Sequence, residues 1–292
     1  MKPHIYIFDV NSIFGRAFPH TNKRVMDGKI NSSDFIGETP VYALRETLRL
    51  IKSEINYLQH NFGSTNTHIV MVCDAPGDNF RHRLYPQYKS GRPPKPEHRK
   101  IQENLLYDML IAAGYPCLRV DDVEADDVMS TLTTKLSAHG ILCTMFTGDK
   151  DLMSLCNENV FIYYGKVKKL IDVEYVEKKF GMKGSRVLDF LALAGDSVDS
   201  VPGVTGIADV SAKELLSLFE FNDLIADPDI ILGSDLKRKK SLHLRMKEGK
   251  KEALLSRSLV ELKCDVELGM NFKNMLFTQP QPSKFLPYFF QI

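Results

Sequence analysis

Three carboxylates stand close together in residues 123–127, Val-Glu-Ala-Asp-Asp. An apolar periodic segment follows, so a helix is expected to begin here, with Glu124 and Asp127 on one face. Like charges this close repel each other, and the free N–H groups of a first helical turn offset only part of the cost. A divalent cation would offset the rest. The alternative for this segment alone is a solvated acidic helix start without a ligand.

Other acidic residues follow apolar runs that are predicted to be strands. The runs cover residues 4–10, 67–73, 116–120, 141–146 and 160–164, and helical periodicity covers residues 41–58, 101–113, 173–180 and 186–194. Apolar strands that alternate with helices are typical of an α/β fold, in which a mostly parallel central sheet carries helices on both faces. The carboxyl ends of parallel strands share one edge, where such sheets bind ligands. We therefore expect the acidic side chains to cluster at that edge.

Nine carboxylates are predicted to gather there. They are Asp9, Asp74, Glu124, Asp126, Asp127, Asp149, Asp151, Asp196 and Asp199. Carboxylate oxygens without His or Cys suit Mg²⁺ or Mn²⁺ better than zinc, and Mg²⁺ keeps several of its waters, so the set is too large for one ion. Two or more ions are expected. A pair of ions about 4 Å apart is the usual device for in-line displacement at a phosphodiester.

The composition is that of an ordinary globular protein. The chain has 292 residues, 43% of them hydrophobic and 26% charged, which suffices for one large domain or two modest ones. A net charge of +1 indicates no partner, so any nucleic-acid argument depends on local patches. The 5 cysteines form no CxxC pair, and no apolar run reaches membrane-spanning length. We expect a cytoplasmic protein with reduced thiols and no membrane contact.

A basic, proline-rich segment covers residues 76–100. Its cations are Arg81, Arg83, Lys89, Arg92, Lys95, Arg99 and Lys100, and Tyr85 and Tyr88 stand among them. Cations that contact phosphates and rings that contact bases are typical of proteins that bind single-stranded nucleic acid. A solvated loop is the alternative that composition leaves open.

A glycine-rich turn in residues 201–219 is predicted to join two helices. The backbone N–H groups of such a turn can receive an anion, and a phosphate of a nucleic-acid duplex fits this role. A plain helical hairpin without a ligand is the alternative.

Six segments, in this order and spacing, resemble the 5′ nuclease family, which comprises the N-terminal 5′ nuclease domain of bacterial DNA polymerase I and stand-alone phage relatives, the flap endonucleases. They are FDVNSIFGRAF, VCDAPGDNFRHRLYPQYKSGRPPKP, VEADDV, TGDKDLMSL, LDFLALAGDSVDSVPGV and CDVELGM. The resemblance implies a PIN-like α/β core in residues 1–183 and a helical DNA-binding part in residues 184–292. It also implies a Mg²⁺- or Mn²⁺-dependent hydrolase that cuts 5′ flaps, nicked ends and RNA primer ends.

The resemblance also implies roles for single residues. The nine carboxylates match the metal ligands of the family. Arg16, Arg81, Lys89 and Arg92 match cations that contact phosphates, and Lys89 and Arg92 are expected to stabilise charge on the scissile phosphate. Tyr88 matches a ring that stacks near the cleaved nucleotide.

Two segments match larger devices of the family. Residues 76–100 match an arch or clamp over the 5′ strand. The turn with Gly203, Gly206 and Ser211 matches a helix-three-turn-helix that grips duplex phosphates and usually binds a monovalent cation such as K⁺.

This turn departs from the family pattern Gly-x-Gly-x-Lys-Thr-Ala. Residues 206–212 are Gly-Ile-Ala-Asp-Val-Ser-Ala, so the second Gly and the Lys are lost. Ala208 adopts positive φ less easily than Gly, and Asp209 brings a negative charge towards a phosphate. Ser200 stands where the family usually has Asn. A basic run within residues 237–251 could compensate, although such a run is more often a solvated helix face.

The leading hypothesis is a structure-specific, metal-dependent 5′ nuclease of DNA replication or repair, in the cytoplasm of a bacterial or phage-infected cell. A catalytically weak homologue that holds junction DNA without turnover is the alternative favoured by the altered turn. A phosphatase or Toprim-like enzyme would explain only residues 148–151.

The expected partners are branched or nicked DNA, an RNA primer on DNA and a separate DNA polymerase, and the expected state is a monomer. Residues 283–290 are reminiscent of a sliding-clamp docking peptide, and packing on the domain's own surface is the alternative.

Overall fold

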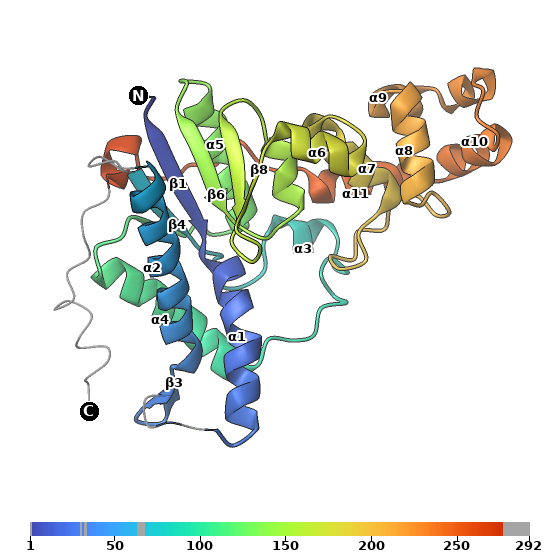
Figure 1. Ribbon diagram of the computed structural model, residues 1–292. Helices are drawn as coiled ribbons and strands as arrows, with labels where there is room; N and C mark the ends of the chain where they lie inside the picture. The colour runs from blue at the N-terminus through green and yellow to red at the C-terminus, as the bar shows by residue number, and fades with distance from the viewer. Residues whose placement is uncertain (1, 30, 32–33, 63–67, 277–292) are drawn as a thin grey trace.

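The fold centres on a six-stranded sheet with the order β5–β4–β1–β6–β7–β8 (Figure 1). The structure, a computed structural model, describes residues 2–29, 31, 34–62 and 68–276. The strands are β1 (His4–Asp9), β4 (His68–Val72), β5 (Cys117–Leu118), β6 (Leu142–Phe146), β7 (Val160–Tyr164) and β8 (Lys169–Ile171). Neighbouring strands are parallel except β7 and β8, which are antiparallel. The predicted α/β class with a mostly parallel sheet is confirmed, and β8 is an edge strand that the sequence pattern does not predict.

Helices cover both faces of the sheet (Figure 1). One face carries α1 (Val10–Met26), α2 (Tyr42–Phe62) and α4 (Glu97–Ala112), and the other carries α5 (Ala125–Ser137) and α6 (Val173–Phe180). In β1, Ile5 and Ile7 belong to one apolar cluster and Phe8 belongs to the other. The strand is therefore buried on both faces, which is why its sequence is continuously apolar.

Helix α1 follows β1 directly because Asp9 both ends the strand and caps the helix. The Asp9 carboxylate accepts a hydrogen bond from the backbone N–H of Ser12 at 2.8 Å, as an N-cap residue does. The buried positions of α1 include Ile13, Phe14 and Phe18 at helical spacing. No helix is predicted here from the sequence, since polar residues break the apolar pattern, and the short helix α3 (Phe80–Leu84) and the hairpin of β2 (Phe35–Ile36) and β3 (Thr39–Pro40) also escape prediction.

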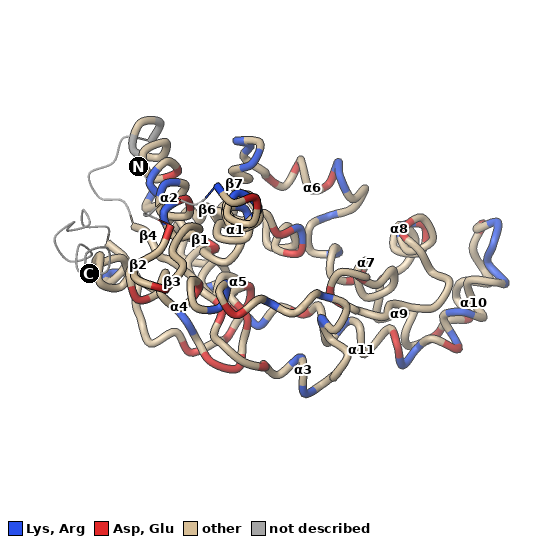
Figure 2. The backbone as a smooth tube through the Cα atoms, turned by 90° about the horizontal axis from the view of Figure 1, so that it is seen from below, with Lys and Arg blue, Asp and Glu red and all other residues tan. Residues whose placement is uncertain are grey.

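The C-terminal helices extend from one side of the sheet (Figure 1). They are α7 (Val187–Ala194), α8 (Asp209–Leu218), α9 (Phe221–Ala226), α10 (Lys239–Glu248) and α11 (Lys250–Val260). Helix α7 packs against both α8 and α11. Lys and Arg side chains concentrate on α10 and the segment before it, at the end of the molecule farthest from the sheet (Figure 2). The proposed clamp-docking peptide at residues 283–290 lies outside the described residues.

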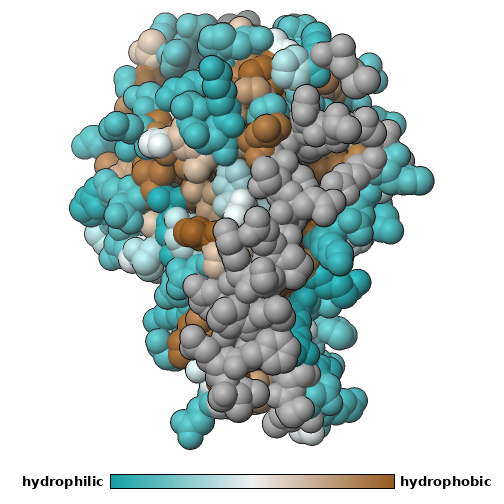
Figure 3. Space-filling model, turned by 90° about the vertical axis from the view of Figure 1, so that its left-hand side faces the viewer, coloured by the Kyte–Doolittle hydropathy of each residue, from teal (hydrophilic) through white to brown (hydrophobic). Residues whose placement is uncertain are grey.

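The molecular surface has no sign of a membrane-spanning element in the described ranges. No helix there combines the length and apolar character that crossing a bilayer requires. On the face seen in Figure 3, hydrophilic side chains predominate and apolar ones lie in small groups between them.

A buried ion pair joins three parts of the chain at the back of α5. Arg81 of α3 is 2% exposed and forms a two-pronged contact with Asp127 of α5, at 2.6 and 2.7 Å. The same guanidinium donates to the carbonyl oxygens of Leu259 and Glu261 at the end of α11, at 2.8 and 2.7 Å. Asp127 also accepts from the backbone N–H of Lys263 at 2.9 Å. This cluster therefore fastens the C-terminal helices to the α/β part of the fold.

We expect Asp127→Asn to lower the free energy of unfolding by about 3–5 kcal/mol, because it removes the two-pronged counter-charge of the buried Arg81 and leaves only the longer contact with Glu124 at 3.4 Å. Urea unfolding followed by circular dichroism measures this change. The matched control is Arg83→Met, which removes an ion pair to Asp122 whose side chains are 61% and 49% exposed. The control should cost less than about 1 kcal/mol. Equal losses in the two variants would contradict the role of the buried pair.

Candidate active site

Five of the nine predicted carboxylates line one cleft at the carboxyl edge of the sheet, which has a volume of ≈ 700 Å³. They are Asp9, Asp74, Glu124, Asp126 and Asp149. They come from four places in the chain, namely the ends of β1, β4 and β6 and the first turn of α5. The topology of the sheet brings these strand ends together, as the sequence pattern predicts.

Asp9 is held at the floor of this cleft. It is 5% exposed, and one carboxylate oxygen accepts from the Thr147 hydroxyl at 2.7 Å while the other accepts from the Ser12 N–H. Burial, followed by the nearby charges of Asp74 and Asp149, raises the pKa of Asp9 to about 7, although the two hydrogen bonds oppose this shift. The raised pKa indicates that the charged form of Asp9 is destabilised, mainly by burial and less by its acidic neighbours, and a nearby cation would offset this cost.

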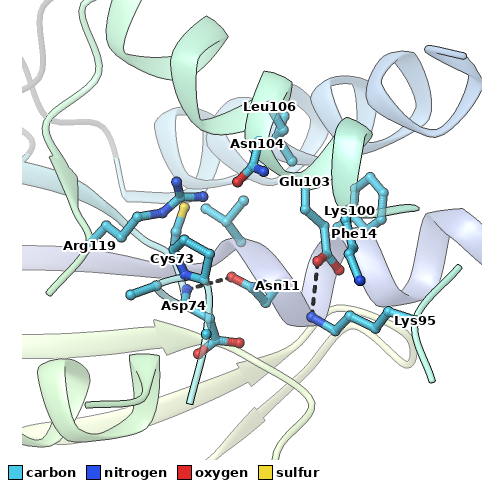
Figure 4. Close-up of a pocket in the computed structure, with 14 residues that line it drawn as sticks. Asn11, Phe14, Cys73, Asp74, Lys95, Lys100, Glu103, Asn104, Leu106 and Arg119 are labelled. Atoms are coloured by element: carbon cyan, nitrogen blue, oxygen red, sulfur yellow. Dashed lines mark hydrogen bonds and ion pairs between the residues drawn. The ribbon is translucent and has the colours of Figure 1, made fainter. Parts of the chain in front are cut away.

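Asp74 is oriented by two backbone contacts. Its N–H donates to the side chain of Asn11 at 2.8 Å, as Figure 4 shows, and its carboxylate accepts from the N–H of Ala125 at 2.9 Å. These contacts tie the end of β4 to α1 and to the start of α5. Beside Asp74 lies a smaller pocket of ≈ 270 Å³, whose lining includes Phe14 and Arg119 (Figure 4).

A second group of carboxylates continues from Asp149. The N–H of Asp151 donates to Asp149 at 2.9 Å, and Asp196 pairs with Lys150 at 3.0 Å. Burial and then the charge of Asp149, with further contributions from Asp196 and Asp199, raise the pKa of Asp151 to about 7. Its Oδ1 atom is buried without a hydrogen-bond partner among the described residues. These four carboxylates are thus close enough to influence one another, and they lie next to the first cleft.

Two cations of the basic segment enter the acidic site. Lys89 pairs with Glu124 and lies 3.8 Å from Asp199, and Arg92 pairs with Asp199. Burial alone would raise the pKa of Glu124, but Lys89 and Arg81 hold it below its ordinary value. The Lys89 backbone has φ 57° and its N–H donates to the Asp199 carbonyl at 2.9 Å. This left-handed conformation is uncommon for a residue other than glycine, and it aims the ammonium group into the site.

Two predicted site residues lie elsewhere. Asp127, predicted as a metal ligand, is fully buried in this structure, and both its oxygens accept hydrogen bonds, from Arg81, the N–H of Lys263 and the N–H of Glu124. Arg81 is likewise enclosed by its ion pair and by carbonyl oxygens of the C-terminal helices, so it cannot reach a phosphate. The sequence motif includes both residues because their contact positions α5 and its neighbouring carboxylates.

The ring of Tyr88 is also placed differently from the prediction. It is 5% exposed, and its hydroxyl donates to Glu124 at 3.0 Å. The ring lies edge-on to His82, and the Lys89 ammonium lies 4.9 Å from its centre. In this arrangement Tyr88 supports Glu124 and Lys89 and has no face open for a nucleobase.

The remaining predicted cations and turn residues are divided between two places. Arg16 lines the cleft and pairs with Glu54 at 3.6 Å. Gly203 and Gly206 lie in the turn between α7 and α8, Ser211 lies in α8, and none of the three lines the cleft. Sequence reasoning did not assign Thr147 or Asn11, although polar residues next to a strand end or a helix start were a usable signal.

This set of residues fits a divalent cation. Among the described residues, no three His, Cys, Asp or Glu side chains converge at ligand distance, and Glu124 and Asp199 are paired with Lys89 and Arg92. The donors that line the cleft are all oxygen atoms, the pKa values of Asp9 and Asp151 are raised, and Asp151 has an unpaired buried oxygen. Closely spaced carboxylate oxygens of this kind suit Mg²⁺ or Mn²⁺.

A parallel sheet with carboxylates and cations at its carboxyl edge defines a class of protein, the metal-dependent enzymes that hydrolyse phosphodiesters. Two family profiles match consecutive parts of the chain. The profile of the 5′-3′ exonuclease N-terminal resolvase-like domain matches residues 4–181, and that of the 5′-3′ exonuclease C-terminal SAM fold matches residues 182–283. The chain therefore belongs to the 5′-3′ exonuclease family, as its motifs predict.

Curated relatives agree with this assignment. The chain is 34% identical to the Flap endonuclease Xni of Colwellia psychrerythraea over 73% of this chain and 71% of that protein. It is also 34% identical to DNA polymerase I of Pseudomonas aeruginosa, over 72% of this chain but 23% of the polymerase. The chain thus matches less than a quarter of that polymerase.

Solved structures share the fold. A T5 5′-exonuclease structure with bound zinc ions superposes with a TM-score of 0.64 at 17% identity, over 89% of this chain and 90% of that chain. Human GEN1 in complex with Holliday junction DNA gives a TM-score of 0.59 at 15% identity, over 98% of this chain and 68% of that chain.

The acidic site should make stability depend on pH. Because the folded-state pKa of Asp9 is about 7 and its ordinary value is 3.8, the folded protein binds more protons than the unfolded chain between these values. In EDTA, the free energy of unfolding should therefore fall as pH rises from about 4 to 7. Thermal melting across this range measures the slope. Asp9→Asn should reduce this slope without abolishing it, because Asp151 also has a pKa raised to about 7. The exposed α4 variant Asp108→Asn should leave the slope unchanged, and equal slopes in all three proteins would contradict the expectation.

Proposed function

We propose that this chain is a structure-specific 5′ nuclease that hydrolyses phosphodiesters at 5′ flaps, nicks or primer ends with the help of Mg²⁺ or Mn²⁺. The observation that carries the proposal is the meeting of carboxylates from β1, β4, α5 and β6 with Lys89 and Arg92 in one cleft. Family membership supports the same activity. The relatives named flap endonuclease and 5′-3′ exonuclease support the substrate class.

Eight carboxylates would hold the metal. They are Asp9, Asp74, Glu124, Asp126, Asp149, Asp151, Asp196 and Asp199. A bound divalent cation would activate the attacking water and stabilise negative charge on the phosphate. The chain's own residues hold the carboxylates in place. Thr147 and Ser12 fix Asp9, and the N–H of Ala125 fixes Asp74. Fixed donors need no rearrangement during the reaction.

Lys89 and Arg92 would act on the substrate. Both lie at the mouth of the acidic cleft, where each pairs with a carboxylate that is also a candidate metal ligand. If these carboxylates held a metal ion, the two cations would be released from their ion pairs and could contact a phosphate. They would then stabilise charge on the scissile group, as the family resemblance implies.

The two parts of the chain have different roles in this proposal. We assign catalysis to residues 1–183, with residues 76–100 as the segment that guides the 5′ strand, and duplex binding to the helical part that begins at residue 184. The proposed partners are branched or nicked DNA and a DNA polymerase on another chain, and the proposed state is a monomer.

A junction-binding homologue without turnover is the second candidate. The pairing of Glu124 with Lys89 and of Asp199 with Arg92 favours it, because the chain's own cations neutralise part of the acidic site. It differs from the first candidate in one observable, which is cleavage. Both candidates bind flap DNA.

A 5′-labelled flap and a nicked duplex separate the two candidates. The wild-type protein should cut both in Mg²⁺ and bind without cutting in Ca²⁺, whose larger and more flexible coordination does not reproduce the Mg²⁺ geometry. Asp126→Asn should abolish cleavage and retain binding, and Asp108→Asn should behave like the wild type. Tight binding without cleavage by the wild type in Mg²⁺ would establish the junction-binding candidate.

Lys89→Met should lower the single-turnover cleavage rate by about 100- to 1,000-fold in Mg²⁺, the usual effect of removing one group that stabilises a developing charge. Flap affinity in Ca²⁺ should change much less. Lys52→Met, on an exposed position of α2, is the charge-matched control. A Lys89 variant that cuts at the wild-type rate would remove this residue from the mechanism.

A further inference from the structure

Hydrogen bonds to α7 and α11 hold the glycine-rich turn between α7 and α8 in place. Gly203 has φ 62°, and its N–H donates to the Ser256 hydroxyl of α11 at 2.9 Å. The N–H of Val204 donates to the Leu193 carbonyl of α7 at 2.8 Å. The altered position Ala208 has φ −94°, which any residue adopts, so the loss of glycine there causes no strain. The turn therefore keeps a defined shape despite its changed sequence.

An arginine from α10 lies against this turn. The Arg245 guanidinium donates through Nη1 to the carbonyl oxygen of Thr205 at 3.1 Å, and through Nε to Ser241 at 3.3 Å. Gly206 has φ 81°, and a Cβ atom at this position would overlap the guanidinium. Gly206 is thus required twice, once for its backbone conformation and once because the arginine occupies the space beside it.

The charge of Arg245 is not neutralised locally. No carboxylate in the described part of the chain forms an ion pair with it, and the guanidinium has donors beyond the two that are used. Other cations surround the same end of the molecule (Figure 2). They are Lys237, Arg238, Lys239, Lys240, Lys247, Lys250 and Lys251. Arg238 reaches the first turn of α8, where it donates to Ser211 at 2.9 Å and lies 3.3 Å from Glu214.

A monovalent cation does not fit this turn as it stands. Such an ion would need carbonyl oxygens as ligands, and the Thr205 carbonyl already accepts from Arg245. A guanidinium beside this oxygen would also repel a second positive charge. The structure therefore disagrees with the K⁺ site that the family resemblance implies.

We propose that Arg245 is a built-in cation that takes the place of an exchangeable monovalent ion at the turn, and that the turn and α10 together form a binding site for a phosphate of duplex DNA. A guanidinium can contact a carbonyl oxygen with one edge and a phosphate with another, which a compact ammonium group cannot do. Acidic residues also belong to these helices, namely Asp209 of α8, Glu248 at the end of α10 and Glu252 of α11, but none of them forms an ion pair with Arg245. This inference rests on the proposed function only in taking DNA as the ligand.

The test measures binding rather than cleavage. A fluorescent duplex with a 5′ flap is titrated with the full chain in Ca²⁺, in matched concentrations of KCl, NaCl and LiCl, and anisotropy gives Kd. Wild-type Kd should agree within about twofold among the three salts. Arg245→Met should raise Kd about tenfold, and its plot of log Kd against log salt should have a slope smaller by about 0.9, the value for one lost phosphate contact.

Two further variants make the result specific. Gly206→Ala keeps the arginine and displaces its guanidinium, so it should weaken duplex binding as Arg245→Met does. Lys178→Met removes one positive charge from α6, outside this surface, and should bind like the wild type. Thermal melting of each variant shows whether it is folded, and a single-stranded oligonucleotide of the flap sequence should bind all of them alike.

Two outcomes would overturn the inference. One is a wild-type affinity that is at least fivefold higher in KCl than in NaCl, which would indicate an exchangeable ion at the turn. The other is an Arg245→Met variant that is folded and binds duplex as the wild type does. Neither outcome depends on cleavage, so failure of the nuclease proposal and failure of this inference are distinguishable.

Discussion

The buried pair of Arg81 and Asp127 is the contact on which the arrangement of the site depends. It fixes the first turn of α5, where Glu124 and Asp126 face the cleft, and it binds the last carbonyl oxygens of α11 to the same point. Removing two charges from water is costly, and only the surrounding hydrogen bonds make such a pair tolerable. The role of this pair is to position other groups. One contact sets the position of the carboxylates relative to both the basic segment and the C-terminal helices.

The carboxylates at the carboxyl edge of the sheet repel one another, and neighbouring groups stabilise their arrangement. Carboxylates at the strand ends accept hydrogen bonds from backbone or hydroxyl donors, and for Asp9 the Thr147 hydroxyl and the Ser12 N–H oppose the burial that raises its pKa. Lys89 and Arg92 offset more of it from the opposite side. Metal ions would need the same carboxylates, and a substrate phosphate would need the same cations. The ion pairs of Lys89 and Arg92 therefore hold these charged groups in positions where the ligands can replace their partners.

The sequence predicted the sheet and the acidic edge for a physical reason. Strands buried on both faces must be continuously apolar, and the residues that follow parallel strands must share an edge, so Asp9, Asp74 and Asp149 could be placed together without coordinates. It did not separate Asp127 from its neighbours, because a carboxylate that faces an internal arginine and one that faces a cleft have the same side chain. The α1 helix was not predicted because polar residues stand among its buried positions Ile13, Phe14 and Phe18, although these have helical spacing.

Two departures from the family pattern have structural counterparts far away in the sequence. Ser200 has φ 56°, a conformation that Asn tolerates better than Ser, and its hydroxyl accepts the N–H of Gly91 at 3.2 Å, which ties the loop of Asp199 to the basic segment. The turn that lacks the family lysine meets Arg245 instead, 40 residues along the chain. In both places the sequence departs from the family motif, and a contact with a residue distant in the sequence stabilises the loop or turn instead. A comparison of the motif alone shows which residue is missing. It does not show the compensating residue, because that residue belongs to another element of the fold.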